Sequence, residues 1–412
     1  MRKNLSKMNF NDLKYKIENC SKKYFSEVQS LRRHFHQNPE LSFAEVETAG
    51  YIMLKLSERG IYFKKGFANN GIVAEVEGTG NFMGSKRIIA LRADVDGLPI
   101  TEENDVIYKS VKPGIMHACG HDFHMASLLG TAFILNDLRD TFAGKVKFVF
   151  QPAEEKIPGG AKQMIQQGAL LPDEPDIMLA QHVYPQLNSG SIGIKPGIYM
   201  ASTDEIFITV SGTGGHAATP DEVTDSVSIA AQIIVILQQL VSRFAPPIMP
   251  TVLSFGKFIA NGSTNIIPSS VNIEGTFRTL DENWRAEAKR RIEKIAVSVA
   301  NALGAKCEVR IVDGYPVLKN DEKVAESVVK FASEYIGKEN VHELDIRMTA
   351  EDFAYFAGKY PSVFYRIGTS VKDKICSPLH SSTFNVDESA LETGMGVMAY
   401  LAVKFLMDSD NI

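Results

Sequence analysis

Residues 116–124 read Met-His-Ala-Cys-Gly-His-Asp-Phe-His, and the interpretation of the whole chain starts from this stretch. It gathers one thiol, three imidazoles and one carboxylate around Gly120, which allows the backbone to turn sharply. Cys119 and His121 are two residues apart, so they cannot share a helix face, but on a loop or strand end both can turn towards one ion. A thiolate beside an imidazole suits zinc or another first-row divalent metal. Two ligands do not make a metal site, so other parts of the chain must supply the rest.

The composition describes an ordinary globular protein. A chain of 412 residues is too long for one hydrophobic core, so two domains are expected. The formal net charge of −5 argues against non-specific binding to nucleic acid or to an anionic membrane surface. The four cysteines are widely separated and contain no C-x-x-C pair, which is typical of reduced thiols in a cytoplasmic protein. The N-terminus lacks the apolar core of a signal peptide, and glutamines interrupt the longest apolar stretch, 228–240, so no membrane span is expected.

The first half of the chain alternates helices and strands. Apolar spacing predicts a long helix over 11–37 that ends at Asn38-Pro39, because the residue before proline disfavours helix. The elements that follow are a helix over 44–60, strands over 71–77 and 87–92, a helix over 126–138, a strand over 145–150, a helix over 161–168 and a strand over 177–180. This alternation predicts an α/β domain with a mixed, largely parallel sheet.

Side chains that can ligate a metal follow directly on three of these strands. They are Asp94, Asp96, Glu154, Glu155 and His182. In open α/β sheets the carboxyl ends of the strands form the ligand-binding crevice. The sequence therefore predicts that these residues meet Cys119 and His121 at one metal site.

From about residue 201 the pattern changes to β-α-β-β-α-β, the split ferredoxin-like unit. Its strands are predicted over 206–210, 251–255, 270–278 and 307–312, and its helices over 221–243 and 282–303. We therefore expect a catalytic metal domain made of residues 1–200 and 314–412, with residues 201–313 inserted as a lid. The last part of the chain is predicted to hold a helix over 324–336, a strand over 363–367, His380 in a loop, and a helix over 388–407.

The adjacent glutamates suggest two roles. Neighbouring side chains in an extended segment point apart, so one can ligate metal while the other faces a bound water and carries its proton to the leaving nitrogen. Five residues are candidate ligands: Cys119, His121, Glu155, His182 and His380. They are too many for one tetrahedral ion, but two ions about 3.5–4 Å apart would use them all.

The remaining polar residues around these ligands are interpreted as supporting groups. Asp94 and Asp96 can be ligands or hydrogen-bonding partners of the ligand imidazoles, and Asp122 is expected among such partners. His36, with Arg32 beside it, is interpreted as capping a helix end near Pro39.

Nine motifs resemble those of the M20 metallopeptidase family, in the amidohydrolase branch that contains hippurate hydrolases, N-acyl-amino-acid deacylases and auxin-conjugate hydrolases. They are RRHFHQNPELSFAE (32–45), LRADVDGLPI (91–100), MHACGHDFH (116–124), QPAEE with GGA (151–161), GGHAATP (214–220), NIIP (265–268), GTFR (275–278), TAEDF (349–353) and SPLHS (377–381). They span nearly the whole chain in the family's order.

The resemblance implies roles for individual residues. Glu154 would be the general base, and the five candidate ligands would hold two divalent ions (zinc, manganese, cobalt or nickel) with Cys119 bridging them. The inserted domain would mediate a homodimer or tetramer, so that His216 reaches the partner's active site and stabilises the oxyanion. Asn265 and Arg278 would hold the polar end of an N-acyl amino acid, with Arg278 pairing with its carboxylate.

Several other functions are compatible with parts of the pattern. A dipeptidase or carboxypeptidase of the same family is one alternative, and a non-catalytic metal-binding protein is another. A cysteine hydrolase with Cys119 as nucleophile is a further possibility, but the excess of ligands argues against it. A zinc nucleobase deaminase would need H-x-E and P-C-x-x-C, and the sequence contains neither.

Overall fold

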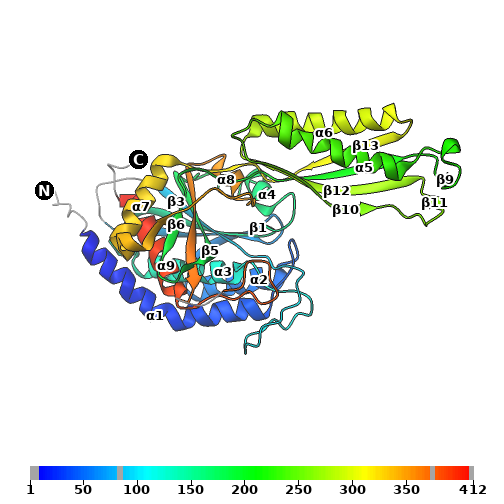
Figure 1. Cartoon of the computed structure of the whole chain (residues 1–412). Coiled ribbons are helices and arrows are strands. Elements are labelled where there is room, and N and C mark those ends of the chain that lie inside the picture. The colour runs from blue at the N-terminus through cyan, green and yellow to red at the C-terminus, as the bar shows by residue number, and fades with distance from the viewer. Residues whose placement is uncertain (1–8, 81–86, 372–375, 408–412) are drawn as a thin grey trace. The chain divides into compact units, whose positions relative to one another are not determined.

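The computed structural model describes residues 9–80, 87–371 and 376–407, and the chain divides into two compact units (Figure 1). Unit 1 comprises Met1–Gly197, Lys319–Asp345 and Tyr355–Ile412. Unit 2 comprises Ile198–Leu318 and Ile346–Ala354. The segment Ile346–Ala354 thus belongs to unit 2, although the sequence pattern assigns it to the first domain.

Unit 1 is built on an eight-stranded sheet with the order β1-β2-β4-β3-β5-β16-β6-β15. The strands are β1 (Tyr62–Phe67), β2 (Gly71–Thr79), β3 (Ile88–Asp94), β4 (Ala143–Gln151), β5 (Ile177–Asn188), β6 (Ile192–Ile194), β15 (Val341–Glu343) and β16 (Ser362–Ser370). The four central strands β4, β3, β5 and β16 are parallel to one another, as are β6 and β15. The pairs β1–β2, β2–β4 and β16–β6 are antiparallel. The expected mixed, largely parallel sheet is confirmed.

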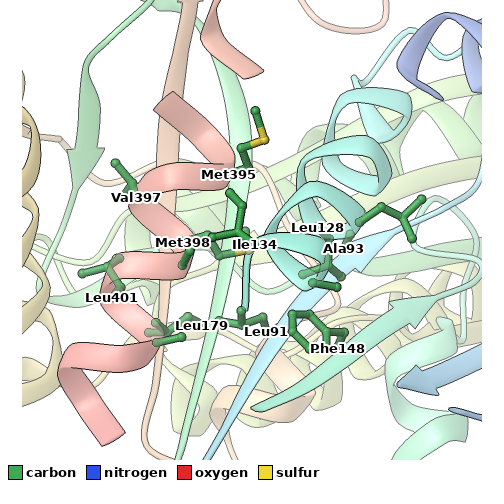
Figure 2. Packing of buried hydrophobic residues seen from close by; sticks show 14 of the residues in the cluster. Leu91, Ala93, Leu128, Ile134, Phe148, Leu179, Met395, Val397, Met398 and Leu401 are labelled. Carbon is green, nitrogen blue, oxygen red and sulfur yellow. The ribbon is translucent and has the colours of Figure 1, made fainter. Parts of the chain in front are cut away.

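Unit 1 also contains several helices. They are α1 (Phe10–Gln37), α2 (Val46–Glu58), α3 (His121–Asp137), α4 (Gly160–Gln166), α7 (Glu322–Ile336), α8 (Ala354–Ala357) and α9 (Ala390–Met407), with short 3-10 turns η1 (Arg139–Thr141) and η4 (Lys338–Asn340). Helices α3 and α9 both contact β3 and β4, and in addition α3 contacts β5 and α9 contacts β16. Helix α1 packs on α3 and α9 (Figure 1). Figure 2 shows side chains of α3 and α9, such as Leu128 and Met398, meeting Leu91 and Leu179 of the sheet.

The main helices and strands of unit 1 agree with the sequence analysis, but two boundaries that matter for the site do not. Helix α3 begins at His121 rather than near residue 126, and β5 continues through His182 instead of ending before it. Almost every side chain of α3 is buried, so its sequence has no polar face from which a periodic pattern could fix its start. The edge strand β1 was missed because its sequence, YFKKGF, is largely exposed and carries no alternating pattern.

Unit 2 contains the expected split ferredoxin-like fold. Its antiparallel sheet has the order β10-β12-β8-β13. The strands are β8 (Asp204–Ser211), β10 (Thr251–Ile259), β12 (Ser270–Thr279) and β13 (Lys306–Asp313), and the helices that contact them are α5 (Ser226–Leu237) and α6 (Glu282–Ala302). A buried ion pair between Arg285 of α6 and Asp204 of β8, with Nη2 and Oδ1 2.7 Å apart, fastens the helix to the sheet.

Shorter elements complete this unit. Strands β9 (Gly215–His216) and β11 (Ile266–Ile267) pair with each other, and η2 (Pro220–Glu222) and the π-turn η3 (Leu240–Phe244) flank α5. The predicted helix over 221–243 is therefore one α-helix with a different turn at each end. Strands β7 (Gly197–Met200) and β14 (Leu318–Asn320) lie where the chain passes from one unit to the other.

Two helical segments, Ser226–Phe244 and Ala390–Met407, are long and apolar enough to cross a membrane by length and composition alone. In the second segment 83% of the apolar window is buried inside the structure, as expected of a core helix. The first segment places Ile229, Ile233 and Leu237 in the core of unit 2. Core helices pass the same test, so these segments are weak evidence for a membrane span.

Candidate metal centre

The five candidate ligands converge within unit 1. Their donor atoms form overlapping groups in which all atoms lie within 4.8 Å of one another: Cys119, His121 and His182; Cys119, Glu155 and His380; and His121, Glu154 and Glu155. In the first group the Sγ of Cys119 lies 3.4 Å from the Nε2 of His182. In the second, the Nε2 of His380 lies 3.2 Å from Oε1 of Glu155. Because the groups share members, they form one continuous cluster of thiol, imidazole and carboxylate donors.

The backbone around Cys119 explains how these segments approach one another. Gly120 has a φ of +82°, and a Cβ there would lie 2.5 Å from Cγ2 of Val183 on β5, so only glycine fits. Helix α3 begins immediately afterwards, which puts His121 in its first turn. The loop that carries His380 is joined to this turn, because the His380 amide donates to the carbonyl of Ala118 at 2.8 Å.

Hydrogen bonds orient two of the imidazoles, those of His121 and His182. The Nδ1 of His121 lies 3.2 Å from Oδ1 of Asp96, and the Nδ1 of His182 lies 2.8 Å from the carbonyl of Val183. Each contact assigns the proton to Nδ1 and leaves Nε2 free to bind a cation. The Nε2 of His121 is buried and has no hydrogen-bonding partner among the described residues. Such an orphaned buried nitrogen, facing a thiol and carboxylates, fits a metal ligand.

Three neighbouring residues are already occupied by other contacts. His124 bonds Asp94 through Nδ1 and accepts the amide of Val183 at Nε2, so neither of its ring nitrogens is free for a metal. Asp94 also pairs with Arg92 at 2.7 Å. Asp96 accepts the Ser42 hydroxyl at 2.6 Å and the Glu155 amide at 3.0 Å on Oδ2. These contacts favour the alternative in which Asp94 and Asp96 orient imidazoles and backbone.

The charges around Cys119 and His121 also fit the binding of a cation. Burial, and then the nearby charges of Glu155 and Glu154, raise the pKa of the Cys119 thiol well above its usual range. Burial by itself lowers the pKa of His121, but Asp94 and Asp96 outweigh it and raise that pKa to about 10. A divalent ion bound here would replace the His121 proton and hold Cys119 as a thiolate. The donor set therefore fits a metal, and its binding would release protons.

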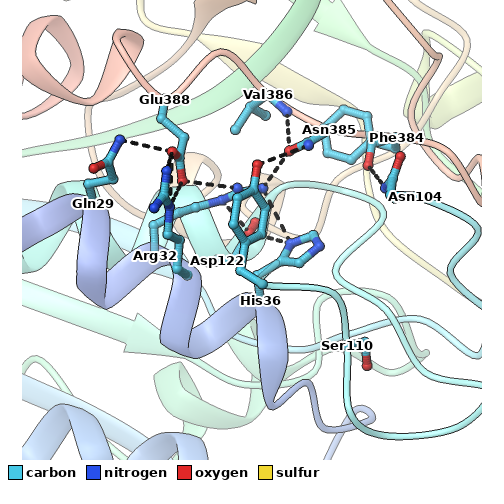
Figure 3. Close-up of polar contacts among 12 residues, drawn as sticks. Gln29, Arg32, His36, Asn104, Ser110, Asp122, Phe384, Asn385, Val386 and Glu388 are labelled. Carbon is cyan, nitrogen blue, oxygen red and sulfur yellow. Dashed lines mark hydrogen bonds and ion pairs between the residues drawn. The ribbon is translucent and has the colours of Figure 1, made fainter. Parts of the chain in front are cut away.

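Asp122 does not lie among the partners of the ligands, which corrects the expectation for it. Its Oδ2 instead pairs with the Nε of Arg32 and the Nδ1 of His36, each at 2.8 Å. The Nε2 of His36 lies 3.0 Å from Oε1 of Glu102. The Nη1 of Arg32 lies 3.3 Å from Oε1 of Glu388 (Figure 3). The side chains of Arg32 and His36 are 0% exposed, so they form an internal ionic network rather than a helix cap. Asp122 points into this network because α3 starts one residue before it.

Three further expected site residues lie in unit 2. His216 is exposed on β9, opposite Ile266, and the amide of the neighbouring Ala217 donates to the carbonyl of Asn265 at 3.0 Å. Asn265 is therefore a neighbour of His216. Arg278 lies near the C-terminal end of β12, where its Nη1 donates to the carbonyl of Met348 at 3.2 Å.

Sequence reasoning missed one buried group close to the centre. Glu45 is 0% exposed, and its Oε1 accepts the amide of Ala153, the residue before Glu154, at 2.9 Å. The signal for it was only its place at the end of the motif over 32–45, because nothing in the local spacing relates it to a turn more than a hundred residues away.

Known proteins are similar to this chain in sequence and fold. The chain matches the family described as Peptidase family M20/M25/M40 over residues 90–404. It is 42% identical over 298 residues to an N-acyl-L-amino acid amidohydrolase of Geobacillus stearothermophilus, covering 72% of this chain and 79% of that protein. It is 37% identical over 399 residues to thermostable carboxypeptidase 2 of Saccharolobus solfataricus, covering 96% and 99%.

A solved structure agrees with these relatives. The Bacillus subtilis YXEP protein, described as a dinuclear metal binding peptidase from the M20 family, has a TM-score of 0.80 and 33% identity, with 94% of this chain and 99% of that chain covered. The fold and the ligand cluster define a metal-dependent hydrolase with a separate ferredoxin-like unit. The chain belongs to the M20/M25/M40 peptidase family.

Cys119→Ser is expected to lose metal while keeping its fold, because a hydroxyl is a far poorer ligand than a thiolate and Cys119 belongs to two of the ligand groups. Elemental analysis of purified protein after dialysis measures the metal content. Cys307→Ser, in unit 2, is the matched control and should retain the wild-type content. Undiminished metal in Cys119→Ser would contradict a bridging role.

Proposed function

We propose that this protein is an amidohydrolase that cleaves the amide bond of N-acyl amino acids, using two divalent ions held by Cys119, His121, Glu155, His182 and His380. The observation that carries this proposal is the continuous donor cluster with Glu154 at its border. The activity named for the Geobacillus stearothermophilus relative supports the substrate class. Zinc, manganese, cobalt and nickel all suit the mixed sulfur, nitrogen and oxygen donors.

The bound ions would polarise the amide carbonyl. They would also lower the pKa of a water, so that the water can lose a proton and attack the carbonyl carbon. Glu154 takes the proton of that water and delivers it to the leaving nitrogen. Its position fits this work, since a carboxylate oxygen of Glu154 lies within 4.8 Å of the donor atoms of His121 and Glu155, and the residue is only 6% exposed. Exclusion of solvent keeps the proton on this path.

Arg278 is proposed to bind the free carboxylate of the substrate. Burial lowers the pKa of its guanidinium, and no carboxylate pairs with it among the described residues. A half-buried guanidinium whose contact is a backbone carbonyl is well suited to accept an anion through two parallel hydrogen bonds.

We further propose that His216 and Asn265 act in the site of a second chain. His216 pairs with Ile266 just before β12 begins, whereas Arg278 is eight residues further along β12 from Ser270. At 3.3 Å per residue, this separation is about 26 Å. One small substrate cannot contact both ends of β12, so His216 and Arg278 can share a substrate only if they come from different subunits. A homodimer, or a tetramer built from dimers, satisfies this condition.

A carboxypeptidase is the second candidate, since the Saccharolobus solfataricus relative carries that name. Both reactions hydrolyse an amide beside a free carboxylate, so the two differ in the acyl group. Assaying one metal-loaded preparation with N-acetyl, N-benzoyl and N-aminoacyl forms of the same amino acid distinguishes them. Preference for the aminoacyl substrates would favour the peptidase over the amidohydrolase.

Glu154→Gln is expected to keep its metals and fold and to lose activity by about 10²–10⁴-fold, because only the proton carrier is removed. Initial rates on an N-acyl amino acid and metal content should be measured on the same sample. Near-normal turnover with full metal loading would refute the role of Glu154.

Arg278→Ala is expected to raise the KM for N-acyl amino acids far more than for the matching N-acyl amino acid amides, which lack the carboxylate. Removing one partner of a desolvated, hydrogen-bonded charge pair costs about 2–5 kcal/mol. Arg310→Ala, on β13 of the same sheet, is the control for general damage to the sheet. Equal losses on both substrates would indicate that Arg278 supports unit 2 itself.

Mixing Glu154→Gln chains with His216→Ala chains is expected to restore activity if His216 acts across subunits. In the mixed dimer one site carries both substitutions and the other is intact, so random mixing predicts about a quarter of wild-type activity. Co-expression with two different affinity tags isolates the mixed dimer. If that dimer is inactive, His216 acts within its own chain.

A further inference from the structure

Two turns of unit 1 share one hydrogen-bond acceptor, and both contain a non-glycine residue with positive φ. Phe43 has a φ of +67° and Ala153 a φ of +54°. The Oε1 of Glu45 accepts the amide of Phe43 and the amide of Ala153, each at 2.9 Å. Residues with a Cβ disfavour this backbone region and persist there only where their surroundings enforce it.

The Glu45 carboxylate is itself rigidly held. It is 0% exposed, and its second oxygen accepts the side-chain amide of Asn70 at 3.0 Å. Its own carbonyl accepts the amide of Ala49 in the first turn of α2. The side chain of Asn70 and the first turn of α2 thus hold Glu45, whose carboxylate accepts the amide of Ala153, in place.

The turn at Ala153 leads directly into the working residues. Ala153 is followed by Glu154 and Glu155, and its carbonyl accepts the amide of Gly160 at 3.0 Å, which closes the loop. The amide of Glu155 donates to Asp96, which also accepts the hydroxyl of Ser42. The segment 42–45 therefore holds the turn at both ends, through Glu45 at Ala153 and through Asp96 at Glu155.

We propose that Glu45 is a positioning residue that enforces the left-handed conformation of Ala153 and thereby aims Glu154 and Glu155. It acts through the backbone and contacts neither substrate nor metal. The inference rests on the proposed function for the role of Glu154, but the placement of Glu155 as a ligand can be tested separately.

Glu45→Ala removes the acceptor, and kcat is expected to fall by about 10–100-fold with a much smaller change in KM, the range seen when supporting hydrogen bonds of a site are lost. Affinity for the metals should fall as well, because Glu155 follows the same turn. Glu45→Gln keeps an oxygen acceptor of the same size and should retain most of the turnover.

The decisive variant is Ala153→Gly, because glycine adopts positive φ without support. If Glu45 acts by enforcing that conformation, the fold loss of kcat caused by Glu45→Ala should be at least about five times smaller in the Ala153→Gly background than in the wild type. A double-mutant cycle measures this difference. A residue needed only for global stability would give no such rescue.

Glu40→Ala is the matched control from the same motif over 32–45. The Glu40 carboxylate accepts the amides of Glu47 and Thr48 at 3.2 and 2.8 Å, at the start of α2. Its removal should lower the melting temperature and leave kcat and metal affinity unchanged. All rates are taken at a temperature well below the unfolding transition of the least stable variant.

Metal affinity, measured by competition with a chromophoric chelator, gives a readout that does not depend on the substrate. If wild-type protein hydrolyses no N-acyl amino acid, the proposed function fails, and the positioning role is then decided by whether Glu45→Ala weakens metal binding and Ala153→Gly restores it. The positioning role is overturned if Glu45→Ala behaves like Glu40→Ala, or if its losses are the same with alanine and glycine at position 153.

Discussion

The carboxylate of Asp96 is the point on which the candidate metal centre depends. It contacts the ring of His121, the backbone of Glu155 and the hydroxyl of Ser42, and so joins three separate segments. Burial alone raises the pKa of Asp96, but the hydrogen bonds from these partners outweigh it and lower that pKa below its usual range. The carboxylate therefore stays ionised although it is buried, and burial strengthens its hydrogen bonds. Its hydrogen bonds hold the imidazole of His121 and the turn that carries Glu155 in place relative to each other.

The sheet of unit 1 makes this arrangement possible. Because β3, β4 and β5 are parallel, Asp96 after β3, Glu155 after β4 and His182 within β5 come together although they are far apart in sequence. Nearly complete burial of α3 and α9 against these strands makes this part of the sheet rigid. Cys119, Glu155 and His380 thus lie on loops and turns, while the long elements carry His121 and His182 and supply the apolar packing around the cluster.

The sequence alone predicted much of this, and the failures have identifiable causes. The convergence of Cys119, His121 and Glu155 was predictable because their chemical types are rare in combination and two of them follow strand or turn signals. Asp122 was misjudged because its direction depends on the residue at which α3 begins, and a fully buried helix does not reveal its start. Glu45 was missed because its partner, the amide of Ala153, is a backbone group that no sequence pattern marks. Long-range contacts to backbone atoms are the part of a site that sequence periodicity cannot supply.

The strand register of unit 2 determines which of its candidate substrate-binding residues lie close together. The pattern over 201–313 predicts the ferredoxin-like fold, and the resemblance assigns roles to His216, Asn265 and Arg278, but neither indicates which of them can act together. The register separates them, because β9 pairs with β11 just before β12 begins (Figure 1), whereas Arg278 is the residue before the last of β12. Asn265 is thereby grouped with His216 rather than with Arg278. A strand of ten residues is a rigid spacer far longer than a small substrate, so residues at its two ends serve the same molecule only when two copies of the strand are present.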